Sequence, residues 1–136
     1  MHLSCDFYSE ALQICAGVEL LVPQPKWNEA RGDAPVEKPA YPVLYLLHGL
    51  SDDQTIWHRR TALERLVDSL GLVVVMPAVN RSYYADQANG YRYFTYVADE
   101  LPQLVKKVLP VSSARKDTFV AGNSMGGYGA YKLALT

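Results

Sequence analysis

Three short apolar runs constrain the fold of this chain more than any other feature of its sequence. They cover residues 43–47, 72–76 and 118–121, and a glycine or proline follows each within two residues. Continuous apolar runs of this length are typical of strands buried on both faces of a parallel sheet. Because helical patterns lie between them, the sequence predicts an α/β fold with right-handed crossovers and helices on both faces of the sheet.

The best-defined helical pattern lies between the first two runs. Thr61 and Glu64 have the spacing of a capping box, in which both side chains accept hydrogen bonds at the helix N-terminus. Gly71 suits the C-terminal cap because glycine adopts the left-handed conformation without steric cost. The apolar residues that share one face of this expected helix are Leu63, Leu66, Val67 and Leu70.

Two further helices are expected, over residues 97–108 and 126–135. The first keeps apolar residues at helical spacing, but Pro102 has no N–H to donate, so it must sit in the first turn or kink the helix. The second consists mainly of small and apolar residues. An aromatic-rich loop over residues 80–94 leads into the helix that contains Pro102.

The segment before the first apolar run divides into two parts. Residues 3–22 partly alternate between polar and apolar, which predicts two antiparallel strands at a sheet edge. Cys5 and Cys15 are then strand residues, and a reducing compartment would keep them as thiols. Residues 23–42 are rich in proline and charge, so we expect a surface loop there.

Composition and charge narrow the possible partners. A net charge of −1 and a pI near 6.3 create no broad field that attracts nucleic acid or an anionic membrane, so a small neutral partner fits better. The chain lacks a basic N-terminal segment with an apolar core and any apolar run near the roughly 20 residues that span a bilayer. We therefore expect a cytoplasmic location. No Cys-x-x-Cys pair or histidine cluster indicates a structural metal.

The candidate chemistry lies where the third apolar run meets the last helix. Residues 122–126 read Gly-Asn-Ser-Met-Gly, the G-x-S-x-G pattern of a nucleophile elbow. The turn is so tight that Ser124 must adopt a strained backbone, and the flanking glycines leave room for it to close. Because the N-terminus of the following helix points at Ser124, we expect the Met125 N–H to be the first oxyanion donor.

Two other interpretations of these glycines are weaker. Glycine and serine also fill ordinary turns, but here the pattern has the strand before it and the helix after it that an elbow requires. A phosphate-binding loop needs Gly-Lys and then Ser or Thr, which do not follow Gly126. A dinucleotide fingerprint needs glycine or alanine where Lys132 stands.

A second element supports a serine nucleophile. His48, Gly49 and Leu50 directly follow the first apolar run, and ligands of open α/β sheets bind at the carboxyl ends of such strands. Gly49 lets the backbone approach a substrate oxygen, and we expect the Leu50 N–H to be the second oxyanion donor. His48 is expected to brace this loop by hydrogen bonding.

Together these motifs resemble bacterial tributyrin esterases of the esterase D group, which also includes S-formylglutathione hydrolases and some carbohydrate-ester esterases. The resemblance spans nearly the whole chain and rests on residues 43–50, Trp57, residues 73–77, Glu100-Leu101-Pro102 and residues 122–135. It implies the α/β-hydrolase fold with a mostly parallel sheet, of which residues 1–136 would be the N-terminal portion of a single domain, truncated after the elbow. It also implies hydrolysis of short-chain acyl esters by a Ser-Asp-His triad that needs neither cofactor nor metal.

The histidines depart from that family pattern. The chain has three of them, His2, His48 and His58, and all precede Ser124, whereas the family's acid and then its base follow the serine. We expect His58 to be solvated and none of the three to act as the base. A serine without a positioned base is a poor nucleophile.

This departure leads to an expectation for the isolated chain. The strand over residues 119–121 would expose an apolar edge, which invites aggregation, so we expect the chain alone to be unstable and nearly inactive. S-formylglutathione hydrolysis, and a non-catalytic remnant or interaction module, stay open as alternatives to a carboxylesterase.

Candidates for substrate-lining residues lie in and after the two loops that follow the first and second apolar runs. Gly49 and Trp57 are candidates for the acyl pocket, although Trp57 suits core packing almost as well. Tyr84, in the aromatic loop, is a candidate for the alcohol side, or for a loop packed on its own rings. The acidic pairs at residues 52–53 and 99–100 are assigned to solvent and not to catalysis. We expect a small-molecule ester as the partner, and a homo-oligomer stays possible.

Overall fold

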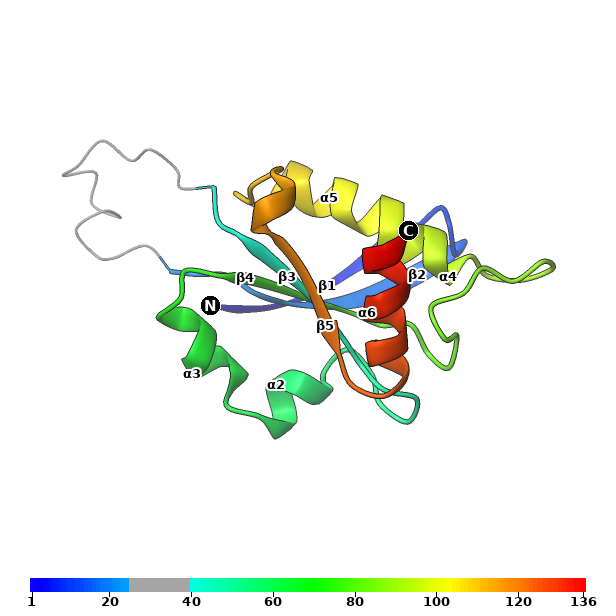
Figure 1. Ribbon diagram of the computed structural model, residues 1–136, viewed down its shortest axis with the longest axis horizontal. Coiled ribbons are helices and arrows are strands. Elements are labelled where there is room, and N and C mark those ends of the chain that lie inside the picture. The colour runs from blue at the N-terminus through cyan, green and yellow to red at the C-terminus, as the bar shows by residue number, and fades with distance from the viewer. Residues whose placement is uncertain (25–39) are drawn as a thin grey trace.

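The computed structural model describes residues 1–24 and 40–136, so most of the expected loop over residues 23–42 lies outside the described part (Figure 1). The strands are β1 (His2–Ser9), β2 (Ile14–Leu21), β3 (Val43–Leu47), β4 (Val73–Pro77) and β5 (Thr118–Gly122). The helical elements are α2 (Ile56–Arg60), α3 (Leu63–Asp68), α4 (Tyr93–Thr95), the π-helical turn η1 (Tyr96–Glu100), α5 (Leu101–Val108), the 3-10 turn η2 (Arg115–Asp117) and α6 (Met125–Leu135). None of the helices in the described ranges has the length and apolarity needed to cross a bilayer.

The five strands form one mixed sheet in the order β1-β2-β4-β3-β5. The predicted antiparallel hairpin is confirmed: β1 lies at one edge and pairs with β2, which runs antiparallel to β4. The three strands expected from the apolar runs pair in parallel, β4 with β3 and β3 with β5. Their carboxyl ends therefore lie along one edge of the sheet, where the elbow and the loop after β3 meet.

Helices cover both faces of the sheet, as predicted. Figure 1 shows α2 and α3 on one side and α4, α5 and α6 on the other. Alternate residues of the central strands feed two apolar layers, because successive side chains of a strand point to opposite faces. The buried core of the larger layer includes Val43, Tyr45, Leu47, Val73, Val75, Tyr96, Leu101 and Met125. The smaller layer is formed by Leu21, Leu46, Val67, Val74 and Met76, with Trp57 packed against it.

The capping box predicted at Thr61 is wrong. The short helix α2, which the sequence analysis missed, ends just before Thr61, and the Thr61 hydroxyl donates to the Trp57 carbonyl. The helix α3 starts only at Leu63, its N-cap is Ala62, and Glu64 makes no capping hydrogen bond. A bend at Thr61 and Ala62 thus separates two short helices where a single longer helix was expected.

Half of the apolar face expected for this helix is exposed. Val67 is buried, whereas Leu66 and Leu70 are exposed. A helix of six residues makes fewer than two turns, so only one turn of α3 can lie against the sheet. Gly71 has the expected left-handed conformation, with a φ of 59°.

The helix expected over residues 97–108 begins earlier and passes Pro102 without a break. Pro102 is the second residue of α5, but helical turns run into α5 from Tyr93, so the proline lies inside the helix and not in its first turn as one of the two predicted positions had it. The preceding residues form the π-helical turn η1, in which the Leu101 N–H donates to the Tyr96 carbonyl. Pro102 has no N–H to donate to a backbone carbonyl. The wider hydrogen-bond spacing of the π-helical turn before it lets the helix continue without that donor.

The third apolar run, β5, is the strand whose burial differs most from the prediction. We expected β5 to be buried on both faces, but its residues are exposed or half-buried, and the Phe119 side chain is 49% exposed. Within the described residues β5 pairs only with β3, so it forms an edge of the sheet. The predicted exposed apolar edge is confirmed.

Candidate active site

The backbone at Ser124 has the strained geometry expected of an elbow. Its φ is 55° and its ψ is −119°, and α6 begins at the next residue. A Cβ on Gly122 would lie 2.4 Å from the Gly126 carbonyl, and a Cβ on Gly126 would lie 2.3 Å from the Leu47 carbonyl oxygen. Only glycine fits these positions, so the turn closes tightly and leaves Ser124 exposed at the sheet edge.

The loop after β3 lies directly against the elbow. A Cβ on Gly49 would stand 3.6 Å from the Ser124 Cβ and 3.4 Å from the Asn123 carbonyl oxygen. Within the described residues, neither the Leu50 N–H nor the Met125 N–H donates to a protein acceptor. Free N–H groups beside a serine are what an oxyanion hole requires. The structure brings these elements together, and the oxyanion role of Leu50 and Met125 stays a prediction.

His48 braces this loop and is not free to act as a base. It is 1% exposed, and its Nε2 accepts a hydrogen bond from the Val79 N–H (3.0 Å). Since Nε2 is an acceptor, we assign the ring proton to Nδ1, which donates to the Gly49 carbonyl (2.8 Å). Both ring nitrogens are therefore occupied.

Tyr84 does not line an open pocket, which corrects the sequence prediction. The side chain is fully buried, and its hydroxyl donates to the His48 carbonyl oxygen (2.9 Å). Its ring packs on Gly129 of α6, where a Cβ would come within 2.5 Å of the ring. Burial raises the pKa of Tyr84, an effect that the hydrogen bond to His48 only partly opposes, so the phenol stays a donor. No spacing in the sequence reveals this contact between distant segments.

Trp57 packs in the smaller apolar layer, the second of its two predicted roles. Its indole N–H donates to the Leu47 carbonyl (3.2 Å), which ties α2 to the end of β3. The ring is half-buried, and its role in an acyl pocket stays a prediction.

One residue of each acidic pair, Asp53 and Glu100, has a structural partner. The Thr55 hydroxyl donates to Asp53 (2.6 Å) and, as the largest lowering cause, holds the pKa of Asp53 below its usual value. Glu100 accepts hydrogen bonds from the Ser9 hydroxyl (2.5 Å) and the Glu10 N–H (2.6 Å). Glu100 therefore ties the turn between β1 and β2 to the helix that begins at Tyr93, a role that sequence analysis missed.

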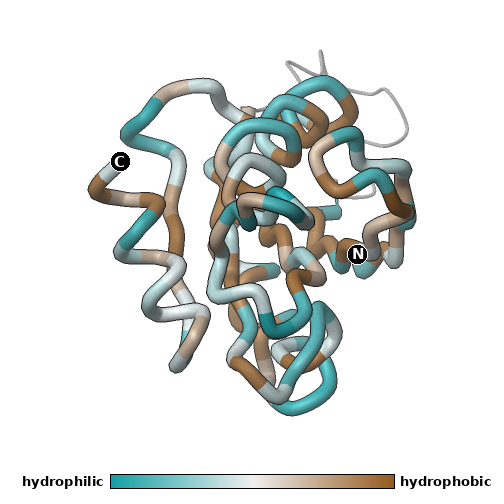
Figure 2. The backbone as a smooth tube through the Cα atoms, turned by 90° about the vertical axis from the view of Figure 1, so that its right-hand side faces the viewer, coloured by the Kyte–Doolittle hydropathy of each residue, from teal (hydrophilic) through white to brown (hydrophobic). Residues whose placement is uncertain are grey.

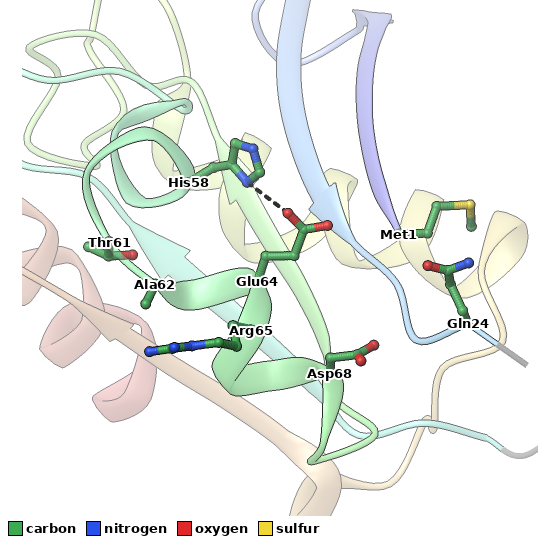
Figure 3. A pocket seen from close by; sticks show the side chains of 8 residues that line it. All are labelled: Met1, Gln24, His58, Thr61, Ala62, Glu64, Arg65 and Asp68. Carbon is green, nitrogen blue, oxygen red and sulfur yellow. Dashed lines mark ion pairs between the residues drawn. The ribbon is translucent and has the colours of Figure 1, made fainter. Parts of the chain in front are cut away.

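The other two histidines lie together, away from the elbow. The rings of His2 and His58 stack with centroids 3.9 Å apart, and His2 bonds to Glu19. Figure 3 shows His58 pointing toward Glu64, with 4.0 Å between its Nδ1 and Oε2 of Glu64, beside a cavity of about 500 Å³. The sequence predicted a solvated His58, but its ring is partly buried against His2. Within the described residues no three His, Cys, Asp or Glu side chains are placed to hold a metal ion.

Comparison with known proteins gives a consistent result. Residues 33–136 match the Esterase family. An acetyl esterase of Caldicellulosiruptor saccharolyticus is 28% identical over 134 residues, which cover 98% of this chain and 50% of that protein. The solved structure of fluorophosphonate-binding serine hydrolase F from Staphylococcus aureus superposes with a TM-score of 0.90 at 36% identity, covering 99% of this chain and 51% of that one.

A second solved structure points the same way. The S-formylglutathione hydrolase of Staphylococcus aureus has a TM-score of 0.85 at 36% identity, covering 99% of this chain and 52% of that one. The expected α/β-hydrolase fold is confirmed by these likenesses. The chain spans about half the length of the relatives it matches.

Proposed function

We infer, from the premise that this chain belongs to the Esterase family, that it carries the nucleophile and oxyanion hole of a serine hydrolase that cleaves short-chain acyl esters. One observation carries the proposal. Ser124 sits in a strained, exposed elbow, and the loop after β3 passes beside it, where a Cβ added to Gly49 would lie 3.6 Å from the Ser124 Cβ. A strained serine backed by free N–H groups suits acyl transfer, in which negative charge develops on the carbonyl oxygen.

The proposed reaction proceeds through an acyl-enzyme. The Ser124 hydroxyl attacks the ester carbonyl while its proton passes to a base, and the N–H groups of Leu50 and Met125 stabilise the tetrahedral oxyanion. The alcohol leaves with a proton as the acyl-serine forms. Water then attacks the acyl-serine and releases the acid.

The general base is not among the histidines of this chain. Both nitrogens of His48 are occupied, and His2 and His58 stack against each other beside Glu19 and Glu64. We propose that the acid and the base lie outside these 136 residues, in keeping with the resemblance that puts them after the serine. Efficient turnover is then a property of a longer protein, and this chain alone should hydrolyse esters poorly.

A fluorophosphonate probe tests the proposal without requiring turnover, because it reacts covalently with an activated serine. We expect slow but specific modification of the 136-residue chain at Ser124, read by mass spectrometry, and none in Ser124→Ala. Ser113→Ala, which removes an exposed serine that precedes β5, whereas the elbow follows that strand, is the matched control and should react like the parent. Absence of modification in folded material would favour the non-catalytic alternative.

S-formylglutathione hydrolysis is the second candidate, supported by the 36% identity to the Staphylococcus aureus enzyme. The two candidates share the nucleophile and differ in the leaving group, an alcohol or the thiol of glutathione. Comparing kcat/KM for p-nitrophenyl butyrate and S-formylglutathione in the longer protein separates them. A clear preference for the thioester would replace the carboxylesterase assignment.

A further inference from the structure

Two consecutive tyrosines in the loop after β4 hold a backbone conformation that bulky residues rarely adopt. Tyr83 has a φ of 50° and Tyr84 a φ of 51°. Such strain persists only where the surrounding structure fixes it, and it concentrates at functional sites. The contacts of these residues must therefore hold the strained turn in place.

Tyr84 is fixed from two directions. On one side its hydroxyl donates to the His48 carbonyl oxygen (2.9 Å). On the other side its ring lies against Gly129, and its own carbonyl accepts a hydrogen bond from Lys132 Nζ (3.0 Å), whose charge lies 4.8 Å from the centroid of the Phe94 ring. Tyr84 is thus a buried connection between α6 and the loop after β3.

The group that Tyr84 holds, His48, shares with the Asp52 N–H (3.2 Å) the fixing of the peptide that carries one oxyanion donor. The His48 ring donates from Nδ1 to the Gly49 carbonyl oxygen (2.8 Å). That carbonyl and the Leu50 N–H belong to the same planar peptide unit, so fixing the carbonyl also fixes the direction of the N–H. The Tyr84 hydroxyl fixes the carbonyl of His48, and the Val79 N–H fixes its ring (3.0 Å).

We propose that Tyr84 is a positioning residue for the oxyanion hole, which acts through His48 to aim the Leu50 N–H at the substrate oxygen. The inference rests on the proposed function. Its chemical basis is preorganisation, since an oxyanion donor contributes only when it is held where the charge develops. Burial keeps the phenol protonated, and the hydroxyl therefore donates throughout the neutral pH range.

Tyr84→Phe tests this by removing only the hydroxyl. Tyr96→Phe is the matched control, because Tyr96 is equally buried and its hydroxyl has no partner within the described residues. In the folded 136-residue chain, we expect Tyr84→Phe to move the amide resonance of Leu50 and to slow fluorophosphonate modification of Ser124 by about tenfold or more. Removing an oxyanion donor outright slows the chemical step by about 10²–10³-fold, and the effect expected of Tyr84→Phe is smaller because the donor remains. Tyr96→Phe should change neither reading.

The amide resonance separates a positioning role from a merely structural one. A structural role would lower the melting temperature but leave the Leu50 resonance and the modification rate of the folded protein unchanged, and that result overturns the proposal. If the parent chain does not react with the probe, the proposed function has failed for this chain. The Leu50 resonance still decides whether the Tyr84 hydroxyl fixes the orientation of the Leu50 N–H.

A second variant covers the case in which Tyr84→Phe does not fold. Lys132→Met removes the ammonium that holds the Tyr84 carbonyl, and Lys107→Met is its control on the exposed face of α5. We expect the first to shift the Leu50 resonance in the same direction as Tyr84→Phe and the second to leave it in place. Identical spectra for the two lysine variants would overturn the proposal.

Discussion

The two sides of Ser124 are built differently. On the side of β3, His48 is 1% exposed, Tyr84 is fully buried, and both are hydrogen-bonded. On the side of β5 and α6, which Figure 2 shows together at one flank of the molecule, Phe119 is 49% exposed and Tyr131 is 75% exposed. The nucleophile is therefore held firmly from one side, while the other side presents apolar surface. The two sides should respond differently to substitution.

The largest expected effect is at the contact between the elbow and β3. In Gly126→Ala the new Cβ would lie 2.3 Å from the Leu47 carbonyl oxygen and 2.8 Å from that of His48. Because both are backbone atoms, the loop must move, and we expect a loss of about 3 kcal/mol in the free energy of unfolding. Urea denaturation measures this loss, and modification of Ser124 should be lost with it.

Gly127→Ala is the matched control one residue along. Its Cβ would meet only the Gly122 carbonyl oxygen, at 3.5 Å, which is ordinary contact. Alanine favours the helix over glycine by about 0.5–1 kcal/mol, so this variant should be as stable as the parent or more so. Equal losses at both positions would mean that the two sides of the elbow are not distinct.

Alkaline pH should lower the free energy of unfolding through a buried tyrosine on the β3 side more than through an exposed tyrosine on the side of β5 and α6. Burial raises the pKa of Tyr45 to about 12, whereas the phenol of an unfolded chain titrates near 10. Between these values the folded chain keeps a proton that the unfolded chain loses, so the free energy of unfolding falls as pH rises, by up to about 2 kcal/mol. Stability measured from pH 8 to 12 should decline less steeply in Tyr45→Phe, and Tyr131→Phe should follow the parent curve.

The strain at Ser124 gives a smaller effect. Glycine adopts the positive φ of this position without steric strain, whereas alanine keeps the Cβ that causes the strain. We expect Ser124→Gly to be more stable than Ser124→Ala by about 1 kcal/mol. Thermal unfolding of the two variants measures this difference, and equal stabilities would show that the elbow stores no strain.

The smallest expected change in stability is at the exposed edge. Phe119→Lys should alter the free energy of unfolding by no more than about 0.5 kcal/mol, because the side chain is half exposed. It should nevertheless reduce self-association, since a charged residue blocks pairing of an edge strand. Sedimentation velocity reads this effect. If Tyr131→Lys on α6 reduces association equally, the strand edge is not the reason for it.

The strands were predictable because their signals are local. A continuous apolar run specifies a strand, and a serine between closely spaced glycines specifies a tight turn, whatever the rest of the chain does. The predicted burial of β5 failed because burial depends on neighbours that the run itself does not contain. The contact of Tyr84 with His48 joins residues 36 positions apart, so no periodicity reveals it. The capping box failed because α3 begins only at Leu63 with Ala62 as its N-cap, so Thr61 and Glu64 do not occupy the N-cap and N3 positions.

The hydrogen bonds of Glu100 constrain the order in which this molecule assembles. Its carboxylate binds Ser9 and Glu10, which precede it by 91 and 90 residues. During synthesis the N-terminal hairpin emerges from the ribosome first, but its turn has no fixed partner until the chain has been translated past residue 100. Contacts between such distant residues form slowly, so the turn of this early hairpin is secured later than its strands are made. In that interval β1 and β2 can pair with each other and with β4, but the turn that joins them lacks the carboxylate that accepts its hydrogen bonds.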